Sequence, residues 1–155
     1  MPESTRKLKL LAIVPALNEE DMVGRVVRDI NRHAPDFDVV VIDDGSVDNT
    51  VAVAEAMGAV VIRHPFNLGI GGAMQSGYKF ALRNGYDVAV QVDGDGQHKP
   101  EYLPEMLEKL RTAGDDADMV YGTRFRGDPG YKVPIGRRVG NLIFAILLTL
   151  LVRQR

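Results

Sequence analysis

The sequence predicts an α/β fold in which helices cover both faces of a mostly parallel central sheet. Short apolar runs alternate with segments of helical periodicity, and this alternation is typical of successive strand-helix-strand units. The first run, residues 8–14, is apolar on both faces, as a buried parallel strand is. Acidic and amide residues follow three of the runs directly, and parallel strands bring such residues to one edge of a sheet.

Five strands are predicted from short runs of branched apolar residues bounded by turn-forming residues. They cover residues 8–14, 39–42, 59–62, 88–92 and 119–121. The first run continues into Pro15 and Ala16 without a small-residue cleavage site, so a buried strand explains it better than a signal peptide.

Four helices are predicted to connect and follow these strands. A stripe of apolar residues at helical spacing predicts the first and consists of Val23, Val26, Val27 and Ile30. The second runs to Met57 from a cap at Asp48. The third covers residues 73–83, after a glycine-rich turn, and the fourth covers residues 100–112, with a proline near its start.

The last segment of the chain has a different character. Residues 142–152 are apolar all round except for Thr149, and arginines flank them on both sides. As a helix, eleven residues cover about 16 Å, well short of the ~20 residues that span a bilayer. We expect residues 1–134 to form one domain and residues 135–155 an interfacial helix of a chain cut from a longer protein. A core helix with snorkelling arginines is the alternative.

Composition excludes some classes of function. The chain of 155 residues suits one folded domain, and it contains no cysteine, which rules out disulfides, thiolate catalysis and cysteine-ligated zinc. The formal net charge of -2 does not by itself argue for or against nucleic acid, and we expect no nucleic-acid partner. Basic residues are concentrated after Arg124, where Asp128 is the one acid, so this tail is expected to meet phosphates or an anionic surface.

The segment that follows residues 88–92 carries the strongest chemical signal. Asp93 and Asp95 stand two positions apart with glycines beside them, and Gln97 and His98 follow. Carboxylate oxygens at the end of a strand suit a hard divalent cation, here Mg²⁺ or Mn²⁺, because the three histidines of the chain are too dispersed for a zinc site. A solvated Asp-Gly turn is the alternative.

Two other loops carry candidate ligand contacts. Asp43 and Asp44 come directly after the second predicted strand, where a carboxylate can accept hydrogen bonds from a base or a ribose, or can simply cap the next helix. Residues 67–73 form a glycine-rich loop that lacks the phosphate-loop pattern but allows a ligand to approach the backbone closely. Arg124, after the fifth predicted strand, can grip a phosphate.

Five ordered motifs together resemble the family 2 glycosyltransferases, and within them the polyprenyl-phosphate group that is similar to dolichyl-phosphate mannose synthase. The motifs are VPALNEE (14–20), VIDDGSVDNT (41–50), NLGIGGAMQSGYKFA (67–81), VDGDGQHKPEYLPEML (92–107) and GTRF (122–125). The resemblance implies a GT-A fold, that is, a nucleotide-sugar-binding α/β sandwich, for the expected domain 1–134.

The resemblance also implies roles for individual residues. The nucleotide-sugar is expected to contact Pro15, Ala16, Glu19, Asp43, Asp44, Gly71 and Asp93, with Asp44 pairing with the base. The metal ligands are expected among Asp93, Asp95 and Gln97. The catalytic residues are expected to be Asp95, Arg124 and Arg137. Arg137 and Asn141 fall on a pattern that meets the acceptor phosphate, where Asn141 replaces a serine.

The implied reaction is the inverting transfer of a hexose from a UDP- or GDP-sugar to a polyprenyl phosphate, at the cytoplasmic face of the membrane. Transfer to a hydroxyl acceptor in cell-surface polysaccharide synthesis is one alternative. A truncated donor-binding module without turnover is another. A nucleotidyltransferase is a third, although it requires a basic glycine-rich loop after the first strand, where this chain has the segment 15–19, which is acidic instead.

Overall fold

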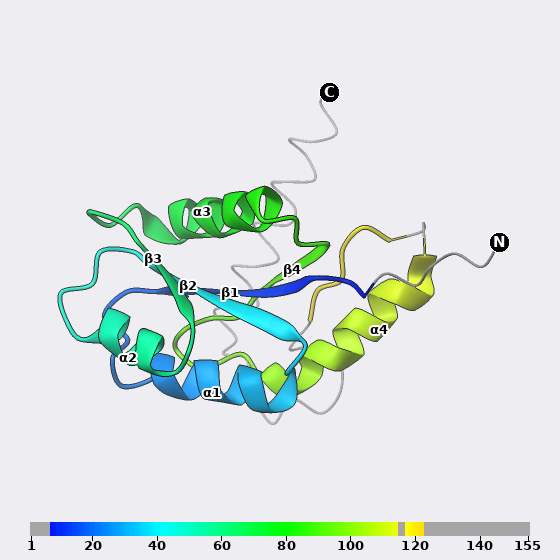
Figure 1. Ribbon diagram of the computed structural model, residues 1–155, viewed down its shortest axis with the longest axis horizontal. Coiled ribbons are helices and arrows are strands. Elements are labelled where there is room, and N and C mark those ends of the chain that lie inside the picture. Colours follow the sequence, from blue (N-terminus) through cyan, green and yellow to red (C-terminus); the bar gives the residue numbers. More distant parts are fainter. Residues whose placement is uncertain (1–6, 115–116, 123–155) are drawn as a thin grey trace, which may run out of the picture. The chain divides into compact units, whose positions relative to one another are not determined.

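The computed structural model describes residues 7–114 and 117–122, which contain a four-stranded sheet in the order β3-β2-β1-β4 (Figure 1). All neighbouring strands are parallel. The strands are β1 (Leu10–Ala16), β2 (Phe37–Asp43), β3 (Val60–Arg63) and β4 (Val88–Gln91). The helices are α1 (Val23–His33), α2 (Thr50–Ala56), α3 (Gly69–Arg83), the 3₁₀ turn η1 (Pro100–Tyr102) and α4 (Leu103–Ala113). The predicted α/β fold with a parallel sheet is confirmed.

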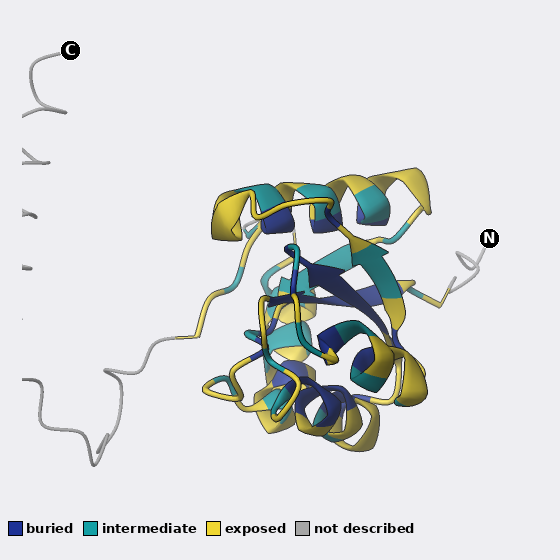
Figure 2. Ribbon diagram, turned by 90° about the vertical axis from the view of Figure 1, so that its left-hand side faces the viewer, coloured by how far each residue is buried: buried dark blue, intermediate teal, exposed yellow. Residues whose placement is uncertain are grey.

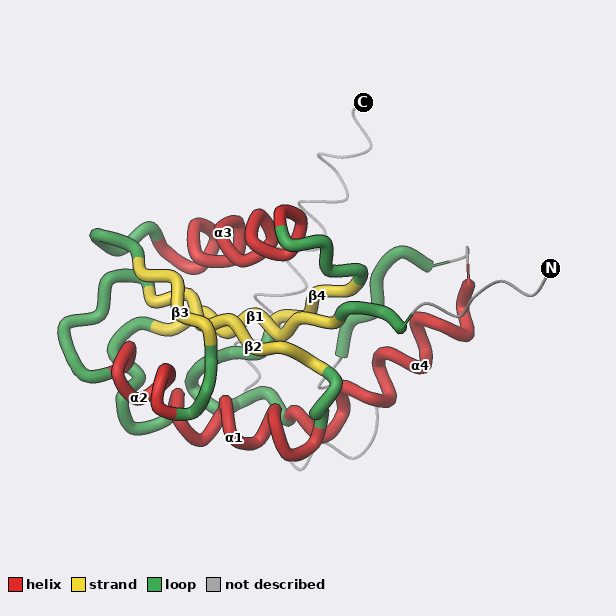
Figure 3. The backbone as a smooth tube through the Cα atoms, in the orientation of Figure 1, coloured by secondary structure: helices red, strands yellow, loops and turns green. Residues whose placement is uncertain are grey.

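The strand order explains which helix covers which face. The chain moves outward from β1 to β2 and β3, then crosses back to place β4 on the other side of β1. Because such crossovers are right-handed, this reversal moves α3 to the opposite face from α1 and α2. Figures 1 and 3 show the result, a sheet with α3 on one side and α1, α2 and α4 on the other.

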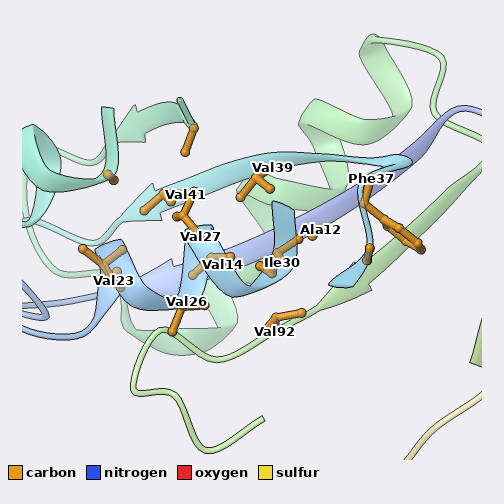
Figure 4. Close-up of a cluster of buried hydrophobic side chains, with 14 of the residues drawn as sticks. Ala12, Val14, Val23, Val26, Val27, Ile30, Phe37, Val39, Val41 and Val92 are labelled. Atoms are coloured by element: carbon orange, nitrogen blue, oxygen red, sulfur yellow. The ribbon is translucent and has the colours of Figure 1, made fainter. Parts of the chain in front are cut away.

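Alternation along the strands divides the core between the two faces. Ala12 and Val14 of β1 pack in the cluster between the sheet and α1, whereas Leu11 and Ile13 pack in the cluster between the sheet and α3. Figure 4 shows the first cluster, where the predicted apolar stripe of α1 points at the sheet. Figure 2 shows buried strands between helices whose outer faces are exposed. The central strand β1 is therefore apolar throughout, because both of its faces are covered.

Gly77 brings α3 close to the central strand. A Cβ atom at this position would overlap with Cγ2 of Ile13, which is fully buried. The missing side chain therefore lets the helix backbone lie directly on β1. Ala73, Met74 and Ala81 complete the buried face of the same helix.

Two predicted boundaries are corrected. The third helix begins at Gly69 rather than at residue 73, so the glycine-rich segment is its first turn and not a preceding loop. Residues 119–121 lie within the described part of the chain and do not form a strand. Met119 and Tyr121 are largely exposed, at 76% and 79%, so this segment lacks the burial that an inner parallel strand requires.

The C-terminal predictions lie outside the described residues, including the helix expected within 135–155. Backbone contacts divide the chain into the units Met1–Val120 and Tyr121–Arg155, and all the helices and strands named above belong to the first. The domain boundary at residue 134 stays a prediction. Within the described ranges, no helix is both long and apolar enough to cross a membrane.

Candidate functional site

The loops that carry the acidic motifs lie at the carboxyl edge of the sheet. β1 and β4 are neighbours, but the chain leaves β1 toward β2 and returns only after β3, so the edge between β1 and β4 is the point where the strand order reverses. Ligands of open α/β sheets bind in the crevice at this point. The loop after β1 begins at Leu17, and the loop after β4 contains Asp93 and Asp95.

Hydrogen bonds join the loop after β1 to the loop after β2. Asn18 adopts a left-handed conformation (φ 54°), and its backbone N–H donates to Oγ of Ser46 at 2.8 Å. In return, its side-chain Oδ1 accepts from the backbone N–H of Val47 at 3.0 Å. The N–H of Glu19 donates to Oγ1 of Thr50, also at 2.8 Å. The two loops therefore form one unit that holds the residues after Ala16 in place.

Asp48, the predicted cap of the second helix, lies one residue before the N-cap position, which is Asn49 and makes no side-chain capping hydrogen bond. Oδ1 of Asp48 accepts the backbone N–H of Thr50, the first residue of α2, at 3.0 Å. The other oxygen of Asp48 accepts the N–H of Glu20 at 3.1 Å. One carboxylate thus binds both the first residue of the helix and the loop after β1.

Asp43 is fully buried and keeps one oxygen without a hydrogen bond. Its Oδ1 accepts the backbone N–H of Ser46 at 3.2 Å. Among the described residues, its Oδ2 has no hydrogen-bond partner, although Nε of Arg63 lies 3.4 Å away. Because a buried carboxylate oxygen without a donor is costly, this atom marks a place where a donor from a ligand would be stabilising.

Asp44 differs from Asp43 because the protein itself occupies both of its oxygens. Oδ1 accepts from Nδ1 of His64 at 2.7 Å and from the N–H of Leu68 at 2.9 Å, and Oδ2 accepts from the N–H of Gly69 at 2.8 Å. Burial raises the pKa of Asp44, but the hydrogen bonds from His64, Leu68 and Gly69 outweigh it and hold the pKa below its usual value. Asp44 is therefore an ionised anchor for the start of α3.

Asp93 is oriented by its neighbours in the loop after β4. Its Oδ1 accepts from Nε2 of Gln91 at 2.8 Å. Its backbone N–H donates to Nδ1 of His98 at 3.1 Å, so the proton of a neutral His98 sits on Nε2, which lies 3.4 Å from Oδ2 of Asp93. His98 thus helps to orient the Asp93 carboxylate from the side of Oδ2. The sequence left the role of His98 open.

Asp95 is exposed and lies within electrostatic range of Glu19. The backbone N–H of Gln97 donates to Oδ1 of Asp95 at 2.9 Å, which closes a tight turn around Gly96. Burial raises the pKa of Glu19, and the negative charges of Asp95 and Asp48 raise it further. A cation bound between the two loops would be stabilised by this negative potential.

The donor atoms at this edge fit a hard divalent cation. Asp93 and Asp95 offer carboxylate oxygens, which Mg²⁺ and Mn²⁺ prefer. In the described part of the chain, no group of three acidic or histidine side chains is arranged to hold a metal ion. Such a cation would therefore need further oxygens from water or from a ligand, as Mg²⁺ bound through one or two carboxylates and substrate phosphates does.

Gly94 fixes the distance between the acidic loop and the end of β1. A Cβ atom on Gly94 would lie 2.8 Å from the carbonyl oxygen of Pro15 and 3.4 Å from Cβ of Ala16. The backbone between the two aspartates therefore rests on the two residues expected to contact the nucleotide. This contact brings two of the predicted motifs together, although they are about 80 residues apart in the sequence.

Several predicted site residues remain apart from this cluster or outside it. Gly71 lies in the first turn of α3, exposed, with open space where a Cβ would be. Arg124, Arg137 and Asn141 lie outside the described residues. His64 was not predicted as a site residue. It follows the last residue of β3, just as Asp44 follows Asp43, the last residue of β2. Its position at the carboxyl end of a parallel strand was the available signal.

Comparison with known proteins agrees with this geometry. The family model described as "Glycosyl transferase family 2" matches residues 11–146, which is most of the chain. The chain belongs to glycosyltransferase family 2. The resemblance found in the sequence motifs is thereby confirmed.

Curated relatives of this family 2 chain include proteins named for lipid phosphates. It is 32% identical to the UDP-N-acetylglucosamine–dolichyl-phosphate N-acetylglucosaminyltransferase of Methanococcus voltae, over 90% of this chain and 61% of the relative. It is 36% identical to the undecaprenyl-phosphate mannosyltransferase of Micrococcus luteus, over 85% of this chain and 52% of the relative. The chain thus spans a little over half the length of these relatives.

Solved structures share the fold of this family 2 chain. The glucosyl-3-phosphoglycerate synthase of Mycobacterium tuberculosis, in complex with Mn²⁺, UDP and glucosyl-3-phosphoglycerate, superimposes with a TM-score of 0.56 at 26% identity. The alignment covers 66% of this chain and 39% of the synthase. The same synthase with Mn²⁺, UDP-glucose and phosphoglyceric acid gives a TM-score of 0.57 at 27% identity, over 69% of this chain and 40% of the synthase.

Proposed function

We propose that this chain is a metal-dependent glycosyltransferase that moves a hexose from a UDP- or GDP-sugar to a polyprenyl phosphate. The observation that carries the proposal is the contact of the Asp93–Asp95 loop with Pro15 and Ala16, at the edge where the strand order reverses. This contact joins a pair of carboxylates for a cation to a backbone expected to contact a nucleotide. Glu19 adds negative charge beside Asp95.

The nucleotide is proposed to lie across the ends of β1 and β2. The sequence motif favoured Asp44 as the carboxylate that pairs with the base. However, both oxygens of Asp44 already accept hydrogen bonds from His64, Leu68 and Gly69. Asp43, one residue earlier, keeps Oδ2 without a hydrogen bond and is the better candidate for a base N–H. Arg63 covers this atom at 3.4 Å and donates to the carbonyl of Ser46, and its exposed side chain can move aside when a base enters.

The acidic loop is proposed to serve the leaving group. A divalent cation bound there would stabilise the charge that builds up on the departing diphosphate. Asp93 is held by Gln91 and His98, so this carboxylate is oriented before any ligand binds. Arg124 and Arg137 are proposed to add positive charge at the donor and acceptor phosphates, and Asn141 to meet the acceptor.

A lipid phosphate as acceptor is supported by the relatives and by the chemistry. Two relatives carry names that specify dolichyl or undecaprenyl phosphate. An ionised phosphate is itself the nucleophile and needs no strong general base, whereas a sugar hydroxyl does. We propose that the chain acts at the cytoplasmic membrane surface, to which the basic segment 135–155 binds as a peripheral element.

The decisive experiment measures transfer of sugar to lipid. The purified chain is incubated with Mn²⁺ or Mg²⁺, a panel of UDP- and GDP-sugars and a short polyprenyl phosphate, and the lipid product is followed by mass spectrometry. We expect one donor to give a metal-dependent polyprenyl-phosphate sugar. Transfer to a soluble glycan without lipid product would contradict the lipid acceptor and favour the hydroxyl alternative. Metal-dependent donor binding without any transfer would instead identify a donor-binding module.

The proposed membrane contact has its own test. Binding to vesicles containing anionic lipid should weaken as salt rises, because screening shortens the reach of the basic residues. A variant that ends at Arg138 should lose this binding, while neutral vesicles serve as the control. Undiminished binding of the shortened chain would refute the role of the C-terminal segment.

A further inference from the structure

A buried histidine connects three elements at the back of the candidate donor site. His64 follows β3, and its side chain is 8% exposed. Its Nδ1 lies 2.7 Å from Oδ1 of Asp44, at the end of β2, and its Nε2 lies 2.8 Å from Oγ of Ser76, in α3. Because an ionised carboxylate only accepts hydrogen bonds, Nδ1 carries a proton and donates it to Asp44.

The order serine, histidine, aspartate is also that of a nucleophilic triad, but the surroundings exclude this function. Ser76 lies in the interior of α3 rather than on a sharp turn. The backbone N–H groups around it are engaged in the helix, so they cannot form an oxyanion hole. His64 therefore acts on its neighbours by holding them.

The neighbours that it holds join the loop between β3 and α3 to the loop after β2. Asp44 accepts the backbone N–H groups of Leu68 and Gly69, where the helix α3 begins. The segment before them rests on the loop after β2, because a Cβ on Gly45 would meet the backbone of Phe66 at 3.0 Å. The loop between β3 and α3 is thus attached to the end of β2 through one carboxylate.

The carboxylate depends on His64 for its orientation. Asp44 is almost fully buried, so the direction of its two oxygens is set by its donors and not by water. Among the described residues, His64 is the only side chain that hydrogen-bonds to Asp44, and the other two donors are the backbone N–H groups of Leu68 and Gly69. Without the His64 side chain, Asp44 would lose its side-chain donor and its connection to Ser76.

We infer that His64 is a positioning residue for the donor site, which holds the loop between β3 and α3 against the end of β2 through Asp44. This inference rests on the proposed function, because the loop packs against the residues that follow Asp43, the carboxylate proposed to meet the base. The loop is then ordered before the nucleotide binds, so the free energy of binding does not include the cost of ordering it.

Two substitutions separate the two nitrogens of His64. In His64→Asn, the amide nitrogen takes the place of Nδ1 and can still donate to Asp44, but the contact with Ser76 is lost. In His64→Gln, the amide takes the place of Nε2, so the contact with Ser76 is kept and the one with Asp44 is lost. Ser76→Ala is the matched control, because it removes only the outer contact.

The experiment measures two quantities for the wild-type chain and these variants. Calorimetry gives the Kd for UDP and GDP with Mn²⁺, and hydrogen exchange followed by NMR gives the protection of the Leu68 and Gly69 amides without nucleotide. We expect His64→Gln to raise the Kd of the nucleotide about tenfold, the loss of one hydrogen bond to a charged group, and to reduce protection of both amides. His64→Asn and Ser76→Ala should change the Kd less than about threefold.

Each other outcome is decisive. Equal effects of the Gln and Asn variants on Kd would overturn the inference, because a merely structural histidine does not distinguish its two nitrogens. Unchanged protection of Leu68 and Gly69 in His64→Gln would overturn it even if the Kd rose. A wild-type chain that binds neither nucleotide would overturn the proposed function as well, and this result is distinguishable because it appears before any substitution is made.

Discussion

Replacing Gly94 by alanine tests whether the acidic loop is set by its contact with the end of β1. Gly94 is buried and does not have a positive φ, so alanine introduces no backbone strain and acts only through its methyl group. That methyl would lie 2.8 Å from the carbonyl oxygen of Pro15. Ordinary carbon–oxygen contacts begin at about 3.3 Å, so the loop or the strand end must move by about 0.5 Å.

The expected effect follows from this displacement. A misplacement of about 1 Å near a reacting centre costs about 100-fold in rate. Half of that displacement predicts a loss of about tenfold in kcat, or a comparable rise in the Kd of UDP in the presence of Mn²⁺. Unfolding followed by circular dichroism should show a much smaller effect, since the substitution lies in a loop and the loop can shift.

Gly77→Ala provides the matched control, because it adds the same methyl group elsewhere in the same fold. Here the methyl overlaps with Ile13 in the core, so we expect a stability loss of about 1–3 kcal/mol, reduced by up to about 1 kcal/mol through the better helix propensity of alanine. The nucleotide Kd of the folded protein should stay the same. If Gly94→Ala instead leaves both kcat and Kd unchanged, the acidic loop does not rest on β1 and the site described here is wrong.

Further predictions concern the metal and the acid stability of the fold. Asp95→Asn should reduce transfer by about 100-fold or more and abolish the effect of Mn²⁺ on UDP binding in calorimetry, whereas Glu108→Gln, which removes the same charge on the exposed face of α4, should do neither. The lowered pKa of Asp44 means that the folded state binds its proton less readily than the unfolded state does, so its contribution is complete above the ordinary carboxyl pKa and is lost as the pH falls through the lowered value. Asp44→Asn should therefore have a lower Tm at pH 7 and a shallower fall of Tm toward pH 2; parallel Tm curves for variant and wild type would contradict this role.

Local patterns were sufficient to predict most of the fold. The apolar stripe from Val23 to Ile30 forms the buried face of α1, and four of the five predicted strands exist with shifts of one or two residues at their ends. The placement of Asp43 and Asp93 at the same edge of the sheet was also predictable, because the carboxyl ends of parallel strands face the same way. These features depend on periodicity and on strand direction alone.

The remaining features depend on contacts between distant segments. Helix α3 begins earlier than its local sequence indicates, because its first N–H groups are accepted by Asp44, a residue 24 or 25 positions away. The division of labour between Asp43 and Asp44 likewise follows from His64, which reaches Asp44 only in the folded chain. The short strand predicted at 119–121 failed because a run of three residues carries little information without a partner strand.

The position of β4 in the sheet has a consequence for how the protein is made. The partner of β1 on one side, β2, ends at Asp43, whereas its partner on the other side begins at Val88, about 80 residues after Leu10. Until then the most apolar strand of the molecule presents an open row of backbone donors and acceptors, which is the kind of edge on which chains aggregate. The event that closes this edge also brings Asp93 and Asp95 to the end of β1, so a nascent chain exposes this edge until the loop proposed to bind the metal has been synthesised.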